Sequence, residues 1–143
     1  MTTNNTWTET GVVTKLSPLP VANAVTRLTD LIAAKDMKLF AVIDQSAEAS
    51  RAGLQLRETT LVLFGSPAAG TPVMAAAPLS ALDLPLKVLI WADEGQTRVS
   101  YYSPAALAAR HQLGADLAAR LAGIDPLTDS LIAPLSGDLA TSV

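Results

Sequence analysis

The sequence contains no cysteine and only one histidine. Without thiolates the chain cannot form a disulfide, an iron–sulfur cluster or a cysteine nucleophile. A single histidine without cysteine also cannot complete the ligand set of a typical zinc site. We therefore expect no metal site and no cofactor.

Aromatic residues make up only 4% of the chain, and its basic residues are few and scattered. Ten Lys and Arg residues against 13 Asp and Glu residues give a formal net charge of −3, with no basic stripe. A nucleic-acid partner needs clustered positive charge against its phosphates, so we expect no such partner. Binding to a membrane surface is disfavoured for the same reason.

No apolar run reaches the roughly 20 residues that a membrane-spanning helix needs. Residues 1–10 are polar and lack the apolar segment of a secretory signal peptide. We therefore expect a soluble, cytoplasmic protein with no membrane partner. Half of the 143 residues are hydrophobic, which is enough for one buried core. One domain is expected over residues 10–133, with flexible segments at residues 1–9 and 134–143.

The apolar pattern predicts a domain of the α+β class. The clearest helix spans roughly residues 20–35, where apolar residues recur at helical spacing after Pro20. Strands are predicted over residues 11–16, 38–44, 59–64, 86–92 and 97–102. The last two strands should form an antiparallel hairpin. Further helices are predicted over residues 46–52, 73–77, 104–111 and 114–121, with a break at Pro126.

Two segments carry specific expectations. The strand over residues 38–44 is apolar on both faces, so we expect it to be central or covered on both sides. Residues 65–72 are expected to form a loop that ends in Thr71 and Pro72, a cap and first-turn pair for the helix predicted over residues 73–77. The predicted order is a strand, a helix, three or four more strands and then terminal helices. This order favours two layers, with the helices packed on one face of a mainly antiparallel sheet.

Several ordered motifs resemble the DUF302 family. They include Phe-Gly-Ser-Pro-Ala-Ala-Gly-Thr at residues 64–71, Asp-Leu-Pro-Leu-Lys at 83–87, Val-Ser-Tyr-Tyr at 99–102 and Leu-Ala-Ala-Arg-His at 107–111. The resemblance covers roughly residues 10–132. It implies a TBP-like fold in strand-helix-four strands-helix order and a homodimer as the expected partner state. It implies no catalytic residues, because the family's name denotes a domain of unknown function.

Three positions depart from the family pattern. Gln45 stands where a histidine commonly follows the aspartate that ends the second strand. Ser66 and Ala68 stand where the family loop usually carries asparagine and lysine. If that histidine or lysine does chemistry in relatives, this chain should be weaker or different.

The segment Gly65–Thr71 invites comparison with a phosphate-binding loop, because two glycines precede a hydroxyl residue after a strand. The lysine that such a loop needs is missing, so a tight turn that uses glycine's conformational freedom is the simpler interpretation. Backbone N–H groups near Thr71 could still hold a carboxylate or a small anion. The candidate ligand-binding residues are Gly65, Ser66, Gly70, Thr71, Met74, Tyr102 and His111.

Three residues are candidates for acid–base catalysis. His111 could act as a general base, ligate a haem or metal together with Met74, or only cap the end of its helix. Asp44 could instead cap the helix that follows it, and Asp83 could shape a turn. The two carboxylates would work as a pair only if the fold brings them together.

The low charge, the two-faced apolar strands and the lack of a catalytic constellation favour a non-enzymatic protein. We expect it to form a homodimer or to bind a small molecule in the cleft between the sheet and residues 66–78. The alternative is an enzyme for a small apolar or carbonyl substrate, with His111 and Asp44 or Asp83 as acid–base groups. The position of His111 relative to residues 65–72 separates these two hypotheses.

Overall fold

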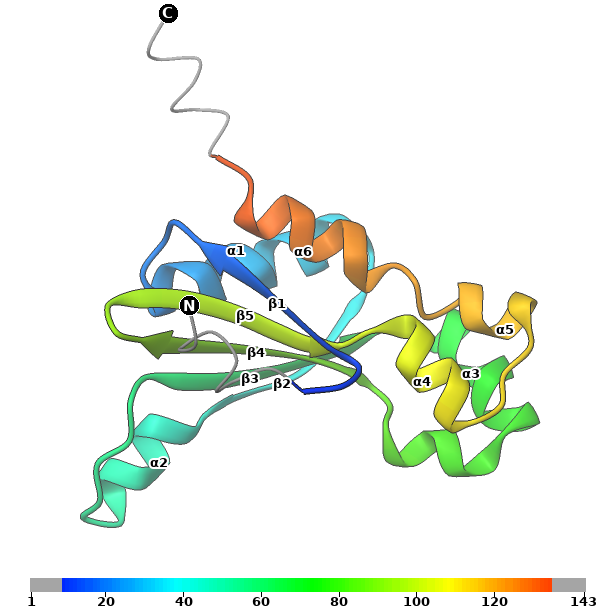
Figure 1. The fold of residues 1–143 in the computed structure, drawn as a ribbon, viewed down its shortest axis with the longest axis horizontal. Helices are drawn as coiled ribbons and strands as arrows, with labels where there is room; N and C mark the ends of the chain where they lie inside the picture. Colours follow the sequence, from blue (N-terminus) through cyan, green and yellow to red (C-terminus); the bar gives the residue numbers. More distant parts are fainter. Residues whose placement is uncertain (1–8, 135–143) are drawn as a thin grey trace, which may run out of the picture.

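The computed structural model describes residues 9–134, so the flexible segments expected at the two termini lie almost wholly outside the described residues. An antiparallel sheet in the order β1-β5-β4-β3-β2 forms the centre of the fold (Figure 1). Its strands are β1 (Val12–Ser17), β2 (Lys38–Asp44), β3 (Thr59–Gly65), β4 (Leu86–Asp93) and β5 (Gln96–Tyr102). The predicted α+β class and the β4–β5 hairpin are confirmed.

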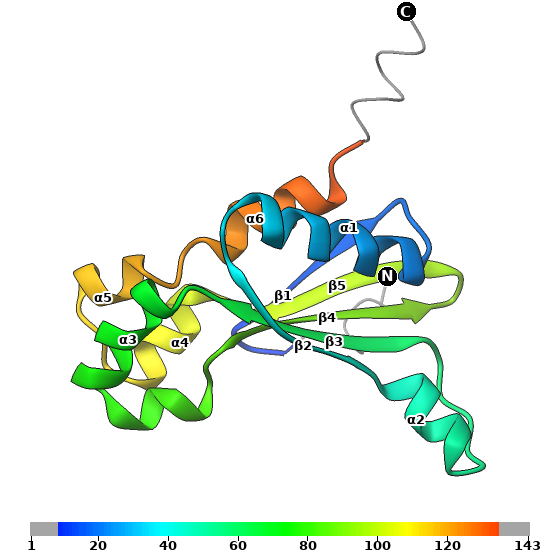
Figure 2. The same cartoon turned by 180° about the vertical axis from the view of Figure 1, so that it is seen from behind.

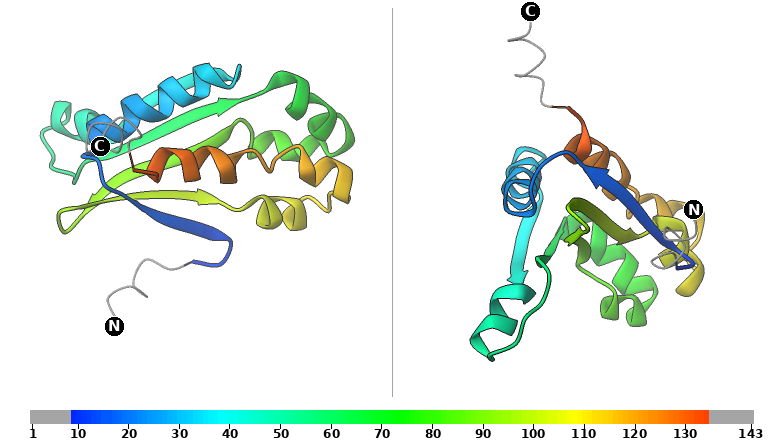
Figure 3. Two further views of the ribbon diagram at one scale, coloured as in Figure 1. Left: turned by 90° about the horizontal axis from the view of Figure 1, so that it is seen from above. Right: turned by 60° about the vertical axis from the view of Figure 1, so that its left-hand side comes forward.

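Helices α1 and α6 lie side by side over one face of the sheet (Figures 1 and 3). Helix α2 lies beyond one end of the sheet, and α3, α4 and α5 gather beyond the other (Figure 2). The helices are α1 (Val21–Ala34), α2 (Gln45–Arg51), α3 (Pro67–Ala76), α4 (Pro104–Arg110), α5 (Ala115–Ala119) and α6 (Ile124–Ile132), with a 3-10 turn η2 (Pro78–Leu82). Within residues 9–134, no helix has the length and apolar character that crossing a membrane requires.

Two clusters of buried side chains hold these layers together. The main core packs α1 and α6 against alternate residues of β3, β4 and β5; its largest fully buried members include Leu28, Ile32, Phe64, Ile90, Ile124, Leu127 and Leu131. A second core joins α3, α4 and the α5–α6 connection through Val73, Leu107 and Leu121. Among residues 9–134, no helix lies along the strands on the sheet face opposite α1 and α6 (Figure 1).

Polar contacts fix α6 on the sheet. Lys15 Nζ donates hydrogen bonds to Thr128 Oγ1 at 2.7 Å and to Asp129 Oδ1 at 2.8 Å. The Tyr101 hydroxyl donates to Asp125 Oδ1 at 2.5 Å. Tyr101 is buried, whereas Tyr102 is 45% exposed on the other face, as strand alternation predicts. The residue order of β5 therefore decides which tyrosine anchors α6.

The expected position of the 38–44 strand is wrong. β2 is an edge strand that pairs only with β3, and its large side chains at Leu39, Phe40, Val42 and Ile43 are exposed. Apolar residues on both faces of a strand show that the strand suits an apolar contact, but they do not show which chain supplies it. Nothing in the described part of this chain covers the free edge of β2.

The predicted loop over residues 65–72 is also wrong, because α3 already starts at Pro67. Ser66 caps this helix, with its hydroxyl accepting from the Ala69 N–H at 3.2 Å. Ser66-Pro67 is the same cap-and-proline pair as Thr71-Pro72, and the earlier pair starts the helix, leaving Pro72 inside it.

The helical boundaries near the C-terminus also differ from the prediction. Helix α5 is shorter than predicted, and the chain breaks before Ile124 rather than at Pro126. Pro126 falls in the first turn of α6, where a missing N–H costs no helical hydrogen bond.

Gly11 is held by two constraints, and its replacement should show both. Its φ of +85° is costly for an L side chain, and a Cβ added there would lie 2.8 Å from the Ala106 Cβ. Gly95 has a similar φ of +83° but open space around it. We expect Gly95→Ala to cost about 1–2 kcal/mol of unfolding free energy from backbone strain alone.

Gly11→Ala should cost a further 1–3 kcal/mol or so, because α4 must shift away from the new methyl group. Urea unfolding of the two variants measures the difference. Equal losses in both would show that the contact with Ala106 is relieved without cost.

Candidate functional site

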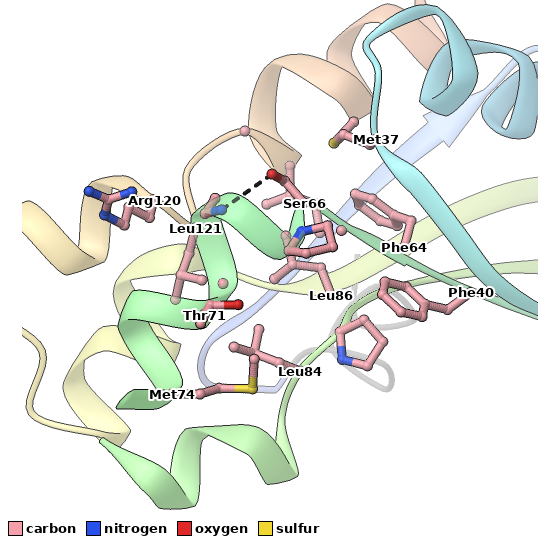
Figure 4. Close-up of a pocket in the computed structure, with 17 residues that line it drawn as sticks. Met37, Phe40, Phe64, Ser66, Thr71, Met74, Leu84, Leu86, Arg120 and Leu121 are labelled. Carbon is pink, nitrogen blue, oxygen red and sulfur yellow. Dashed lines mark hydrogen bonds between the residues drawn. The ribbon is translucent and has the colours of Figure 1, made fainter. Parts of the chain in front are cut away.

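A cavity of about 350 Å³ lies where the two cores meet (Figure 4). Phe64 and Ile124 of the main core form part of its wall, and Leu121 of the second core forms another part. Leu84, just before β4, and Leu86, its first residue, add to the apolar lining, as do Met37, Phe40 and Met74. The cavity occupies the expected cleft between the sheet and residues 66–78.

Helix α3 supplies the wall of the cavity that the sequence singles out. Five of the candidate ligand-binding residues line it: Gly65, Ser66, Gly70, Thr71 and Met74. Gly70 leaves room there, since a Cβ would lie 3.9 Å from Met74 Cε and 4.0 Å from Leu84 Cδ1, which is ordinary contact. Because Ser66 caps α3, it sets where the helix begins and hence which of its residues face the cavity.

The polar groups of the cavity are few. The Ser66 Oγ already accepts a hydrogen bond from the Ala69 N–H, which leaves its O–H as the group that could still donate. The Thr71 hydroxyl has no hydrogen bond to another described residue, and Figure 4 shows it turned toward the cavity. Arg120 lies at the rim, and no Asp, Glu, His or Lys is among the described lining residues. This composition suits binding of an uncharged apolar molecule better than acid–base chemistry.

His111 and Tyr102 do not line this cavity. His111 ends α4, and its Nε2 lies 2.6 Å from Asp83 Oδ2. Arg110 Nη1 donates to both Asp83 oxygens at 3.2 and 3.1 Å, and its guanidinium lies 5.5 Å from the Tyr102 ring centroid. The fold thus brings His111 and Asp83 together, but outside the cavity, which gives no support to a His111-based reaction there.

The carboxyl of Asp83 is held in its charged form. Burial raises its pKa, but the hydrogen bonds from His111 and Arg110 outweigh burial and leave the pKa below its usual value. Met74 lines the cavity while His111 does not, so these two residues do not form a ligand pair. Among residues 9–134, no group of three His, Asp or Glu side chains could hold a metal ion.

Asp44 lies at the opposite end of the sheet and caps α2. Its carboxylate accepts from the Ser46 hydroxyl at 2.6 Å and from the Ala47 N–H at 2.9 Å. These two hydrogen bonds, with Ser46 first, lower the pKa of Asp44. The capping role is confirmed, and Asp44 and Asp83 do not meet as an acid–base pair.

A groove on the uncovered face of the sheet was missed by the sequence reasoning. It measures about 680 Å³ and is lined by Val12, Thr14, Leu56, Arg57, Leu61, Lys87, Leu89, Trp91, Ser100 and Tyr102, among others; we call it the open-face groove. The Ser100 hydroxyl lies at its floor, 3.0 Å from Trp91 Nε1 and 2.8 Å from Thr14 Oγ1. The alternating residues Lys87, Leu89 and Trp91 of the predicted 86–92 strand share one face, and this pattern could have indicated the groove.

Removing the charge of Asp83 should destabilise the fold in a pH-dependent way. A lowered folded-state pKa contributes stability that is present above the unfolded value of 3.8 and is lost as pH falls through the folded value. We expect Asp83→Asn to lose about 1–2 kcal/mol at pH 7, because Arg110 and His111 lose their charged acceptor.

Urea unfolding at pH 7, 5 and 3 should show this loss shrinking below about pH 4. Asp30→Asn is the control, because Asp30 is exposed on α1 and has no side-chain hydrogen bond to another described residue. A difference that stays constant down to pH 3 would contradict the assigned charge.

Known proteins resemble this chain in both sequence and fold. It is 37% identical over 107 residues to proteins named "Fluoride-specific ion channel FluC 1" from Brucella suis biovar 1 and Brucella abortus biovar 1. The match covers 74% of this chain but only 42% and 40% of those two proteins, so the chain spans about two fifths of their length.

A crystal structure of an uncharacterized conserved protein DUF302 from Bacillus stearothermophilus shares the fold, with a TM-score of 0.73 at 14% identity. The superposition covers 87% of this chain and 97% of that one. The sequence pattern of the family described as "Domain of unknown function DUF302" matches residues 13–130. The chain therefore belongs to the DUF302 family.

Proposed function

We propose that this protein is a small-molecule binding module whose site is the cavity between α3 and the start of β4. The observation that carries the proposal is a largely apolar space of about 350 Å³ at the junction of two cores. An engineered apolar cavity of about 150 Å³ already binds benzene, so this space would hold a ligand of roughly twice that size. Gly70 keeps the space open on the α3 side.

The lining also indicates the kind of ligand. Leu84, Leu86 and Phe64 offer apolar contact, which favours a compact hydrocarbon body. The Thr71 hydroxyl, which has no hydrogen bond to another residue of the 9–134 range, can donate to or accept from a polar group on that body. A bicyclic aromatic alcohol such as 2-naphthol has both features and serves as a probe.

Filling the cavity from α3 should weaken the binding of 2-naphthol. Gly70→Leu places a good helix former on α3 and directs its side chain toward Met74 and Leu84. Isothermal titration calorimetry should show saturable binding to the unaltered chain and at least about tenfold weaker binding to Gly70→Leu, a loss of some 1.4 kcal/mol.

Ala68→Leu is the matched control, because Ala68 is an exposed residue of the same helix that does not line the cavity. It should bind 2-naphthol like the unaltered chain. Unchanged affinity in Gly70→Leu, or no saturable binding to the unaltered chain, would contradict the proposal.

A second candidate function is homodimer formation through β2. Four large apolar side chains are exposed on an edge strand whose outer N–H and C=O groups face no other strand of the described chain: Leu39, Phe40, Val42 and Ile43. Such an edge is a ready template for another strand. The register places Val42 opposite Val62 on the helix-covered side and Ile43 opposite Leu61 on the open side, so both faces of the edge are apolar.

A second copy of β2 is the partner that best fits this edge. Two copies related by a twofold axis would pair antiparallel and extend the sheet through one continuous ladder. Lys38 and Asp44 stand at opposite ends of β2, so antiparallel pairing brings each lysine toward the partner's aspartate end. Phe40 both lines the cavity and lies on this edge, so the partner would also cover one side of the binding site.

A charge in the middle of β2 should prevent this pairing. We expect the unaltered chain to sediment at twice its 14.8 kDa mass and Val42→Lys to sediment as a monomer. Leu82→Lys is the control, since it removes an apolar side chain that is 79% exposed on η2, away from β2. A monomeric unaltered chain, or a dimeric Val42→Lys, would exclude β2 as the interface.

A further inference from the structure

Lys87 differs from the other lysines of the chain in its surroundings. It lies on the open face of β4, where it is half-buried and lines the open-face groove. Its Nζ donates to the Pro85 carbonyl at 2.9 Å and to the Asp83 carbonyl at 3.2 Å. Both acceptors are neutral, and Lys87 has no ion pair with any described residue.

The nearest carboxylate is already engaged elsewhere. The Asp83 side chain is turned toward α4, where Arg110 and His111 occupy its oxygens, and only its backbone carbonyl meets Lys87. Burial lowers the pKa of Lys87, and the more distant charge of Asp83 offsets this only in part. A half-buried ammonium without a counter-ion gives up its proton more readily than an exposed one.

The other three lysines provide internal comparisons. Lys15 is ion-paired to Asp129 at 2.8 Å, and its pKa is raised because hydrogen bonds to Asp129 and Tyr101 outweigh the effect of burial. Lys35 and Lys38 are exposed. Lys87 is thus the one lysine among residues 9–134 that combines partial burial, neutral partners and access to a groove.

We propose that Lys87 is a nucleophilic amine that forms an imine with small aldehydes or ketones entering the open-face groove. The Nζ lone pair attacks the carbonyl carbon, and the carbonyl π electrons move to oxygen. A proton passes from nitrogen to that oxygen and gives a carbinolamine. Loss of the hydroxyl group and the second amine proton as water leaves the C=N bond. No oxidation or reduction takes place in this step.

The groove suits this ligand class. Leu61, Leu89 and Trp91 provide apolar contact for the carbon skeleton. Lys87 lines the groove, and the Pro85 and Asp83 carbonyls hold its Nζ, so the reacting amine has a defined position. This site is separate from the cavity beside α3, so the inference does not rest on the proposed ligand-binding function.

Reductive alkylation tests the proposal on the intact, full-length chain. Butanal and sodium cyanoborohydride at pH 7.5 convert any imine into a stable butyl-lysine, which peptide mass spectrometry assigns to a residue. Initial alkylation of Lys87 should be at least about threefold faster than that of Lys35 or Lys38, because more of its amine is unprotonated and the groove gathers the aldehyde.

Two controls separate the folded environment from the local sequence. In about 6 M guanidinium, which unfolds the chain, the faster labelling of Lys87 should disappear and all four lysines should react at similar rates. Lys87→Arg should lose the fast-labelled site, while Lys35→Arg should keep it. Labelling of Lys87 that is less than about threefold faster than that of Lys35 or Lys38 in the folded chain, or a preference that survives unfolding, would overturn the proposal.

Discussion

The covering of only one face of the sheet by helices is the constraint on which the rest of the structure depends. Because side chains alternate along a strand, Val88 and Ile90 of β4 enter the main core, and Lys87, Leu89 and Trp91 face the other way. The covered side is completed by α1 and α6, which bury nearly every large aliphatic side chain they direct at the sheet. The uncovered side keeps the open-face groove.

The cavity beside α3 follows from the same arrangement. The main core ends where α1 and α6 end, and the helices beyond the sheet build a second core around Val73, Leu107 and Leu121. Each cluster is closely packed in itself, but few side chains fill the space between the two clusters, and Gly70 has no side chain to fill it. The space therefore lies at the junction of the two cores, and α3 forms one of its walls.

The sequence predicted what local pattern determines. Periodicity located every strand and α1, and turn chemistry drew attention to Gly65, Ser66, Gly70 and Thr71, which the fold gathers at one cavity. The edge position of β2 could not be predicted, because strand order depends on contacts far apart in the chain. The contact between His111 and Asp83 could not be predicted either, because the two residues are 28 positions apart in the chain. The start of α3 was missed because two cap-and-proline pairs competed.

The segment 83–87 joins the features that the two proposals use. Leu84 and Pro85 line the cavity, whereas the backbone carbonyls of Asp83 and Pro85 hold Lys87 Nζ on the other side. A ligand that displaced Pro85 would therefore also displace an acceptor of Lys87. Asp83 limits such movement, because its side chain is tied to α4 through Arg110 and His111. The polar cluster at the end of α4 therefore holds in place the entry to β4 that both proposed sites share.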